Sequence, residues 1–155
     1  MLRGLLTSAV LISVCLMIHV LGLVLIADWL IDHSLKLKLR VTFWRSTVIL
    51  ISVFAILTVL HLVETFVWAA FYAWWGLFSD VESSWYFSLG SYTTIGYGDV
   101  VLPARWRILG GLEGISGVLL CGLSTAFLFA IVNQMLMSRL EQSRNSGGSV
   151  PSDAR

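Results

Sequence analysis

The chain has 155 residues and a net charge of +1, with 57% hydrophobic and only 12% charged residues. Soluble domains carry about 25% charged residues, so this composition excludes a disordered protein and a soluble globular domain. The low net charge also excludes a nucleic-acid-binding protein that relies on neutralising phosphates. The composition indicates a protein that lies in lipid.

Three long apolar stretches predict three membrane-spanning helices, at residues 4–27, 46–77 and 108–138. The first carries no Asp, Glu, Lys or Arg. At 1.5 Å per residue it reaches about 36 Å, enough to cross a bilayer core of roughly 30 Å. We therefore expect an all-α, multi-pass membrane protein that contacts the lipid bilayer and binds no nucleic acid.

The loop at residues 36–45 predicts the orientation of the chain. It holds Lys36, Lys38, Arg40 and Arg45 and no acidic residue. The positive-inside rule places such a loop in the cytoplasm. We expect the N-terminus outside and the C-terminus inside a cell membrane, and the compact chain without targeting extensions favours a bacterial inner membrane.

The uncharged segment at residues 83–98 is too short to cross the membrane and return as two helices. Its first part predicts a short helix over 82–93, and Asp80 and Glu82 suit the N-terminus of that helix by capping and by charge. The irregular backbone that follows is tolerated at membrane depth only where protein buries it or where it lines a water-filled path. Its two glycines permit φ values at which successive carbonyls face one axis.

The seven residues TTIGYGD at 93–99 resemble the signature TT(V/I)GYGD of pore-loop potassium channels. The resemblance covers residues 46–138. It implies an outer helix at 46–77, a re-entrant pore helix at 82–93, a selectivity filter at 94–98 and an inner helix at 108–138. Each chain of this family supplies one of four filter strands, so a homotetramer is implied. K⁺ is the only metal ion implied, and no cofactor is.

The resemblance assigns roles within this segment. The implied K⁺ ligands are backbone carbonyls and one side-chain hydroxyl. The carbonyls are those of Thr94, Ile95, Gly96 and Tyr97, and the hydroxyl is that of Thr94. Gly98 is the last residue of the filter. Thr93 ends the pore helix, and Asp99 shapes the outer mouth together with Gly98. Gly90 stands where some members of the family place a carboxylate that holds this aspartate. We therefore expect Asp99 to bind Trp85 or water.

The inner helix carries two glycines, Gly117 and Gly122, whose positions resemble that of the family's gating hinge. The alternative is that they permit close helix packing, as small residues do in membranes. The resemblance also directs Ser124 and Thr125 toward the water-filled cavity.

Ionisable residues inside the predicted spans are functional candidates by default. His61 and Glu64 share one helix face, and Glu113 is expected near the same depth. One hypothesis is a proton-sensing cluster behind the filter. The alternative is structural: both carboxylates accept hydrogen bonds from the pore helix, and His61 bridges to Glu64. His19 is expected to form an interhelical hydrogen bond.

Three regions lie outside the resemblance, and one of them is the basic cytoplasmic loop at residues 36–45. Residues 1–35 hold an additional N-terminal membrane helix, and the polar residues 139–155 predict a disordered cytoplasmic tail. No helix carries arginine at every third position, so no voltage sensor is expected.

The function predicted from the sequence is passive, potassium-selective conduction through a homotetrameric pore. Two alternatives stay open: a weakly selective cation channel, and a non-conducting membrane subunit that regulates another channel. The chain holds no HExxH or GxSxG motif, so we do not expect an enzyme.

Overall fold

The structure is a computed structural model that describes residues 2–37 and 43–147. Its elements are α1 (Leu2–Leu37), α2 (Phe43–Trp74), α3 (Val81–Tyr92), the short 3-10 turn η1 (Ala104–Trp106) and α4 (Arg107–Gly147). The described residues contain no β-strand. The predicted all-α fold class is confirmed.

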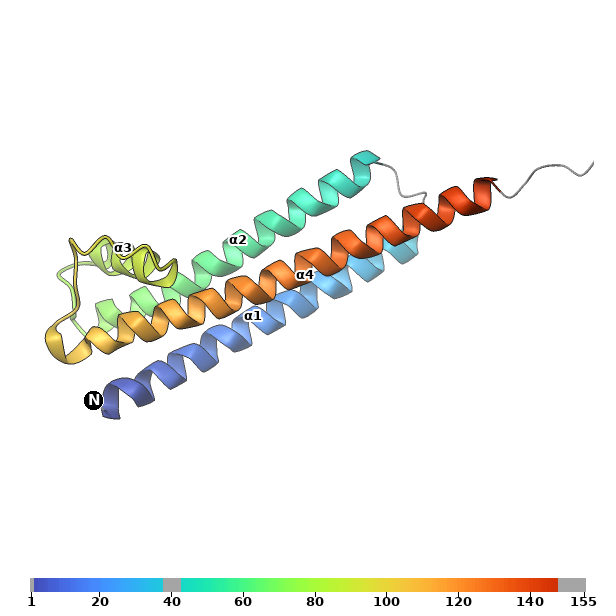
Figure 1. The fold of residues 1–155 in the computed structure, drawn as a ribbon. Coiled ribbons are helices and arrows are strands. Elements are labelled where there is room, and N and C mark those ends of the chain that lie inside the picture. Colours follow the sequence, from blue (N-terminus) through green and yellow to red (C-terminus); the bar gives the residue numbers. More distant parts are fainter. Residues whose placement is uncertain (1, 38–42, 148–155) are drawn as a thin grey trace, which may run out of the picture.

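Three helices are long and apolar enough to cross a membrane, over Leu2–Asp32, Trp44–Trp74 and Ala104–Arg144. Figure 1 shows them side by side, with α1 and α4 running in the same direction and α2 in the opposite one. The chain is therefore a multi-pass membrane protein in contact with the lipid bilayer.

The additional helix α1 packs against both of the other long helices. Near its start, Gly4 lies against the side chains of Ile108 and Leu109 at the start of α4. Further along, Gly22 lies against Leu60 of α2. One apolar core joins all three helices, and its buried members are Leu23, Ile26, Val53, Leu57 and Ile131.

The short helix α3 lies at the end of the bundle that also holds the start of α1 (Figure 1). It begins one residue before the predicted position. Asp80 is its N-cap, and the Asp80 carboxylate accepts the backbone N–H of Ser83 at 2.7 Å, which confirms the predicted cap. This hydrogen bond is the main reason that the pKa of Asp80 lies below its usual range.

The structure corrects the predicted helix ends. α2 ends at Trp74 rather than at residue 77, because Gly76 has a φ of 64° and its N–H bonds to the Ala73 carbonyl at 3.1 Å. α4 continues to Gly147, so the predicted disorder of the tail from residue 139 is wrong up to that point. The segment favours helix because it is rich in Glu, Gln, Arg and Leu.

Two predicted regions lie outside the described residues. They are the centre of the basic loop, residues 38–42, and the last part of the tail, residues 148–155.

Gly117 and Gly122 of α4 have different surroundings. A Cβ atom at Gly117 would collide with the backbone carbonyl of Tyr92, the last residue of α3. A Cβ atom at Gly122 would meet no atom within 4 Å. The missing side chain at Gly117 thus lets α4 approach the end of α3, which favours the packing interpretation at that position.

We predict that Gly117→Ala destabilises the protein and that Gly122→Ala does not. At position 117 the new methyl group meets backbone, which cannot rotate aside, so α4 must move away from α3. At position 122 the space is open, and replacing a helical glycine stabilises by about 0.5–1 kcal/mol. Thermal unfolding of the purified variants in detergent measures both effects, and equal melting temperatures would contradict the assigned contact.

Candidate functional site

The 93–99 segment, which follows α3, has an irregular backbone in which every second residue has a positive φ. The angles are 62° at Thr94, 56° at Gly96 and 82° at Gly98. Among the described residues, Thr94 is the only non-glycine residue with a positive φ. Such a conformation costs a β-branched residue about 1–3 kcal/mol, so its presence points to a functional constraint.

Hydrogen bonds anchor this segment to the end of α3. The N–H of Thr94 donates to the carbonyl of Ser91, and the N–H of Gly96 donates to the carbonyl of Gly90, both at 3.0 Å. These bonds use N–H groups on the α3 side of the segment. Since successive peptide carbonyls in an ordinary strand point to opposite sides, the alternating sign of φ allows the carbonyls here to turn toward one side.

Tyr86 of α3 supports the far end of the segment. Its hydroxyl donates to Oδ2 of Asp99 at 2.8 Å, and its ring stacks on Tyr97 with 6.0 Å between ring centroids. Trp85 instead donates its ring N–H to Thr65 of α2 at 3.1 Å. The expectation that Trp85 binds Asp99 is therefore wrong, because neighbouring side chains on a helix point in directions about 100° apart.

Behind α3, the fully buried Glu113 of α4 joins three helices. Its carboxylate accepts hydrogen bonds from the hydroxyl of Tyr72 in α2, at 2.7 Å, and from the hydroxyl of Ser88 in α3. The Ser88 hydroxyl also lies 2.7 Å from the carbonyl of Thr65 in α2. A buried carboxylate without such donors would be costly, so these contacts fix α3 against its neighbours.

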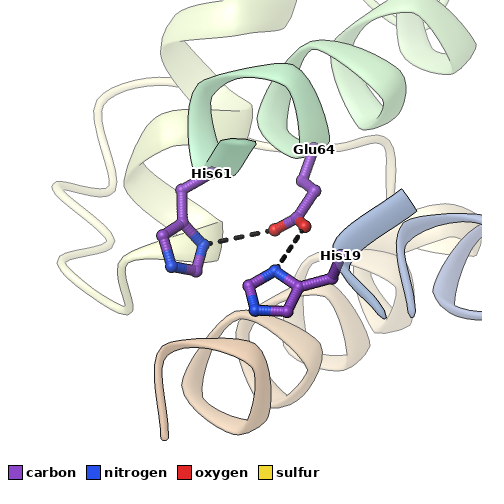
Figure 2. A group of neighbouring side chains, drawn as sticks. All are labelled: His19, His61 and Glu64. Carbon is purple, nitrogen blue, oxygen red and sulfur yellow. Dashed lines mark hydrogen bonds and ion pairs between the residues drawn. The ribbon is translucent and has the colours of Figure 1, made fainter. Parts of the chain in front are cut away.

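The second buried carboxylate, Glu64 of α2, forms a separate network. Its Oε1 lies 2.7 Å from Nδ1 of His19 in α1, and its Oε2 lies 3.2 Å from Nδ1 of His61 (Figure 2). The hydroxyl of Tyr92, at the end of α3, donates to Oε2. Ser124 Oγ of α4 lies 3.1 Å from Nε2 of both histidines. The network connects all four helices.

The structure thus divides the predicted cluster into two. His61 and Glu64 are in contact, as expected, whereas Glu113 has other partners. The contacts of the structural alternative are present, because hydroxyls of α3 bind both carboxylates and His61 bridges to Glu64. The interhelical hydrogen bond of His19 is confirmed.

Sequence reasoning missed several hydroxyl partners of these networks: Tyr72, Ser88, Tyr92 and Ser124. Ser124 was expected to face the cavity, but only 6% of its surface is exposed, and it binds two histidines. The signal available in the sequence was general: a buried carboxylate needs donors, and hydroxyl residues on neighbouring helices supply them.

The end of α3, the 93–99 segment and α4 line a groove of about 480 Å³. Thr94 and Gly96 lie on one side, and Gly114, Val118 and Leu119 of α4 lie on the other. Val118 and Leu119 are 57% and 67% exposed. The groove is therefore an uncovered, largely apolar surface beside irregular backbone.

Three spanning helices and an irregular segment held at one end of the bundle define a membrane protein whose irregular backbone must be buried in protein or line a water-filled path. A family model described as "ion channel" matches residues 48–134, and the chain belongs to this ion channel family. The match includes all of α3 and leaves α1 outside. No curated protein and no solved structure matches the chain.

We predict that Tyr72→Phe lowers the free energy of unfolding by about 1–3 kcal/mol, because it leaves the buried Glu113 carboxylate short of one donor. Tyr86→Phe is the matched control, since it removes the same hydroxyl from an exposed side chain. Thermal unfolding compares the two variants. A loss at position 72 no larger than at position 86 would contradict the assigned role of Tyr72.

The hydrogen bond from Tyr86 is the main reason that the pKa of Asp99 lies below its usual range. The stabilisation from this hydrogen bond to the ionised carboxylate is therefore present above the ordinary carboxyl pKa and is lost as the pH falls through the lowered value.

We predict that Tyr86→Phe raises the pKa of Asp99 toward the ordinary value. A ¹³C NMR titration of labelled aspartate measures this, with Trp85→Phe as the control that leaves Asp99 unchanged. An Asp99 titration that is the same in Tyr86→Phe and the wild type would exclude the hydrogen bond.

Proposed function

We propose that the protein is a potassium-selective channel in which four identical chains surround one pore. The observation that supports it most directly is the alternation of positive φ along residues 94–98. The K⁺ ligands are the carbonyls of this filter, in the order Thr94, Ile95, Gly96 and Tyr97, with the Thr94 hydroxyl. These oxygens replace the water shell of the ion, and repulsion between neighbouring ions lets them leave.

The uncovered surfaces support assembly with further copies. Ile95 and Tyr97 are 57% and 67% exposed, and the groove beside them is open. Irregular backbone at membrane depth needs cover from protein or a water-filled path. A second copy seated in the groove supplies the cover on one side, and four copies around an axis enclose a water path on the other.

The proposed orientation of the chain in the membrane is based on the basic loop at residues 36–45, which the positive-inside rule places in the cytoplasm. α3 and the start of α1 lie together at the opposite end of the bundle (Figure 1). The filter and its outer mouth at Gly98 and Asp99 then face outside, and the C-terminus lies in the cytoplasm, as in a bacterial inner membrane.

The test is the reversal potential of the purified chain in a planar bilayer, with K⁺ on one side and Na⁺ on the other. We expect a value near the K⁺ equilibrium potential. A reversal near zero would replace the proposal with a weakly selective cation channel. The absence of current across pH and voltage would contradict a self-sufficient channel and favour a non-conducting subunit.

Two glycine variants separate the filter from general backbone strain. Gly96 and Gly76 have φ values of 56° and 64°, and a Cβ atom on either would meet nothing within 4 Å. Alanine at either position therefore carries a similar strain of about 1–2 kcal/mol. We predict that Gly96→Ala abolishes K⁺ selectivity or current and that Gly76→Ala retains both. Equal effects on the reversal potential would contradict a filter at residues 94–98.

A further inference from the structure

We propose that His19, His61 and Glu64 form a binding site for one divalent transition-metal ion, with Zn²⁺ as the best match. Two imidazoles and one carboxylate are the donor set of zinc sites that keep an open fourth position. The site is distinct from the filter, which offers carbonyl oxygens to K⁺. It does not depend on whether the chain conducts.

The three side chains already converge on one point. Figure 2 shows the two rings, from α1 and α2, directed at the same carboxylate. One ligand atom from each residue lies within 4.8 Å of the others. The His19–Glu64 and His61–Glu64 separations are 2.7 Å and 3.2 Å. Ligand atoms around a tetrahedral zinc ion are about 3.3 Å apart, so the short His19–Glu64 contact must open by about 0.6 Å, while the ligand pair that is furthest apart, within 4.8 Å, must move closer.

The second ring nitrogen of each histidine, Nε2, also has a hydrogen-bond partner. When Nδ1 of a histidine binds a metal, its Nε2 carries the proton and needs an acceptor. Nε2 of His19 and Nε2 of His61 both lie 3.1 Å from Ser124 Oγ. A hydroxyl oxygen has two lone pairs, so Ser124 accepts one hydrogen bond from each metal-bound ring.

Burial favours an ion at this position. His19 and Glu64 are fully buried, and the His61 side chain is 20% exposed, which leaves one side open for entry. The Tyr92 hydroxyl lies 2.8 Å from Nδ1 of His61. At this distance the hydroxyl binds either the metal ion itself or a water molecule that occupies the fourth coordination position of the ion. The ion displaces the proton that His19 shares with Glu64, because a ligating nitrogen must be unprotonated.

A bound ion would link α1 to α2 beside the residue that ends α3. Tyr92 stands directly before the 93–99 segment and already contacts Glu64 and His61. The metal site therefore gives α1 a defined role: it supplies one of three ligands and ties the additional helix to the part of the chain that holds this segment.

The test is zinc binding by the full chain, purified without a polyhistidine tag. Any bound metal is first removed with a chelator, and the protein is then titrated with ZnCl₂. We expect one zinc per chain by calorimetry and by elemental analysis after desalting. His19→Gln and His61→Gln should lose this zinc, whereas His33→Gln should keep it. His33 is a matched control because it lies on α1 about 21 Å further along the helix axis.

Two further variants distinguish a ligand from a structural side chain. His19→Cys should keep the zinc, because a thiolate also binds it, and its Co²⁺ form should gain a sulfur-to-cobalt absorption band that the wild type lacks. Ser124→Ala should weaken binding about 10- to 100-fold, since it removes the acceptor of both rings.

Three results would overturn the proposal. They are a wild-type chain that retains no zinc, a zinc content that His19→Gln and His61→Gln leave unchanged, and a His19→Cys variant that binds Co²⁺ without the sulfur band.

Discussion

The structure depends on one constraint, which is that backbone N–H and C=O groups at membrane depth must find partners or water. α1, α2 and α4 meet it as continuous helices. The 93–99 segment does not, since alternate residues adopt positive φ and leave the helical hydrogen-bonding pattern. Its N–H groups at Thr94 and Gly96 bond back to α3. The Thr93 carbonyl accepts the Thr94 hydroxyl, and the carbonyls of residues 94–97 are left for water, for other copies of the chain, or for the cation that the proposed function assigns to them.

Two buried carboxylates hold this arrangement in place. Glu113 connects α4 to α2 and α3, and Glu64 connects α2 to α1 and α3. Each carboxylate is fully buried, so each would be strongly destabilising without its donors. Because both sets of donors include α3, the helix that carries the 93–99 segment is fixed from two sides. Gly117 adds a third contact, where α4 meets the end of α3 directly.

Much of the fold could be predicted from the sequence, because hydropathy and capping are local properties. The three spans follow from runs without charge, and the start of α3 follows from Asp80. The TTIGYGD motif identified the segment whose φ values then proved unusual. The contact of Glu64 with His61, three residues away, could be predicted, but the individual hydroxyl partners of Glu64 and Glu113 could not, because they are distant in the chain. The contact of His19 with Glu64 needs α1 to pack at one particular rotation and height against α2, and neither is encoded in a local pattern. The family match leaves α1 outside, so it supplies no guide to that packing.

The central claim, that the carbonyls of residues 94–97 bind K⁺, is tested most directly by solid-state NMR of the ¹³C-labelled protein in proteoliposomes. The measurement compares carbonyl chemical shifts in K⁺ and in Na⁺. The account predicts that the carbonyls of Ile95, Gly96 and Tyr97 shift when K⁺ is exchanged for Na⁺, while that of Leu23, in the core between the helices, does not. Identical filter spectra in the two ions would contradict it.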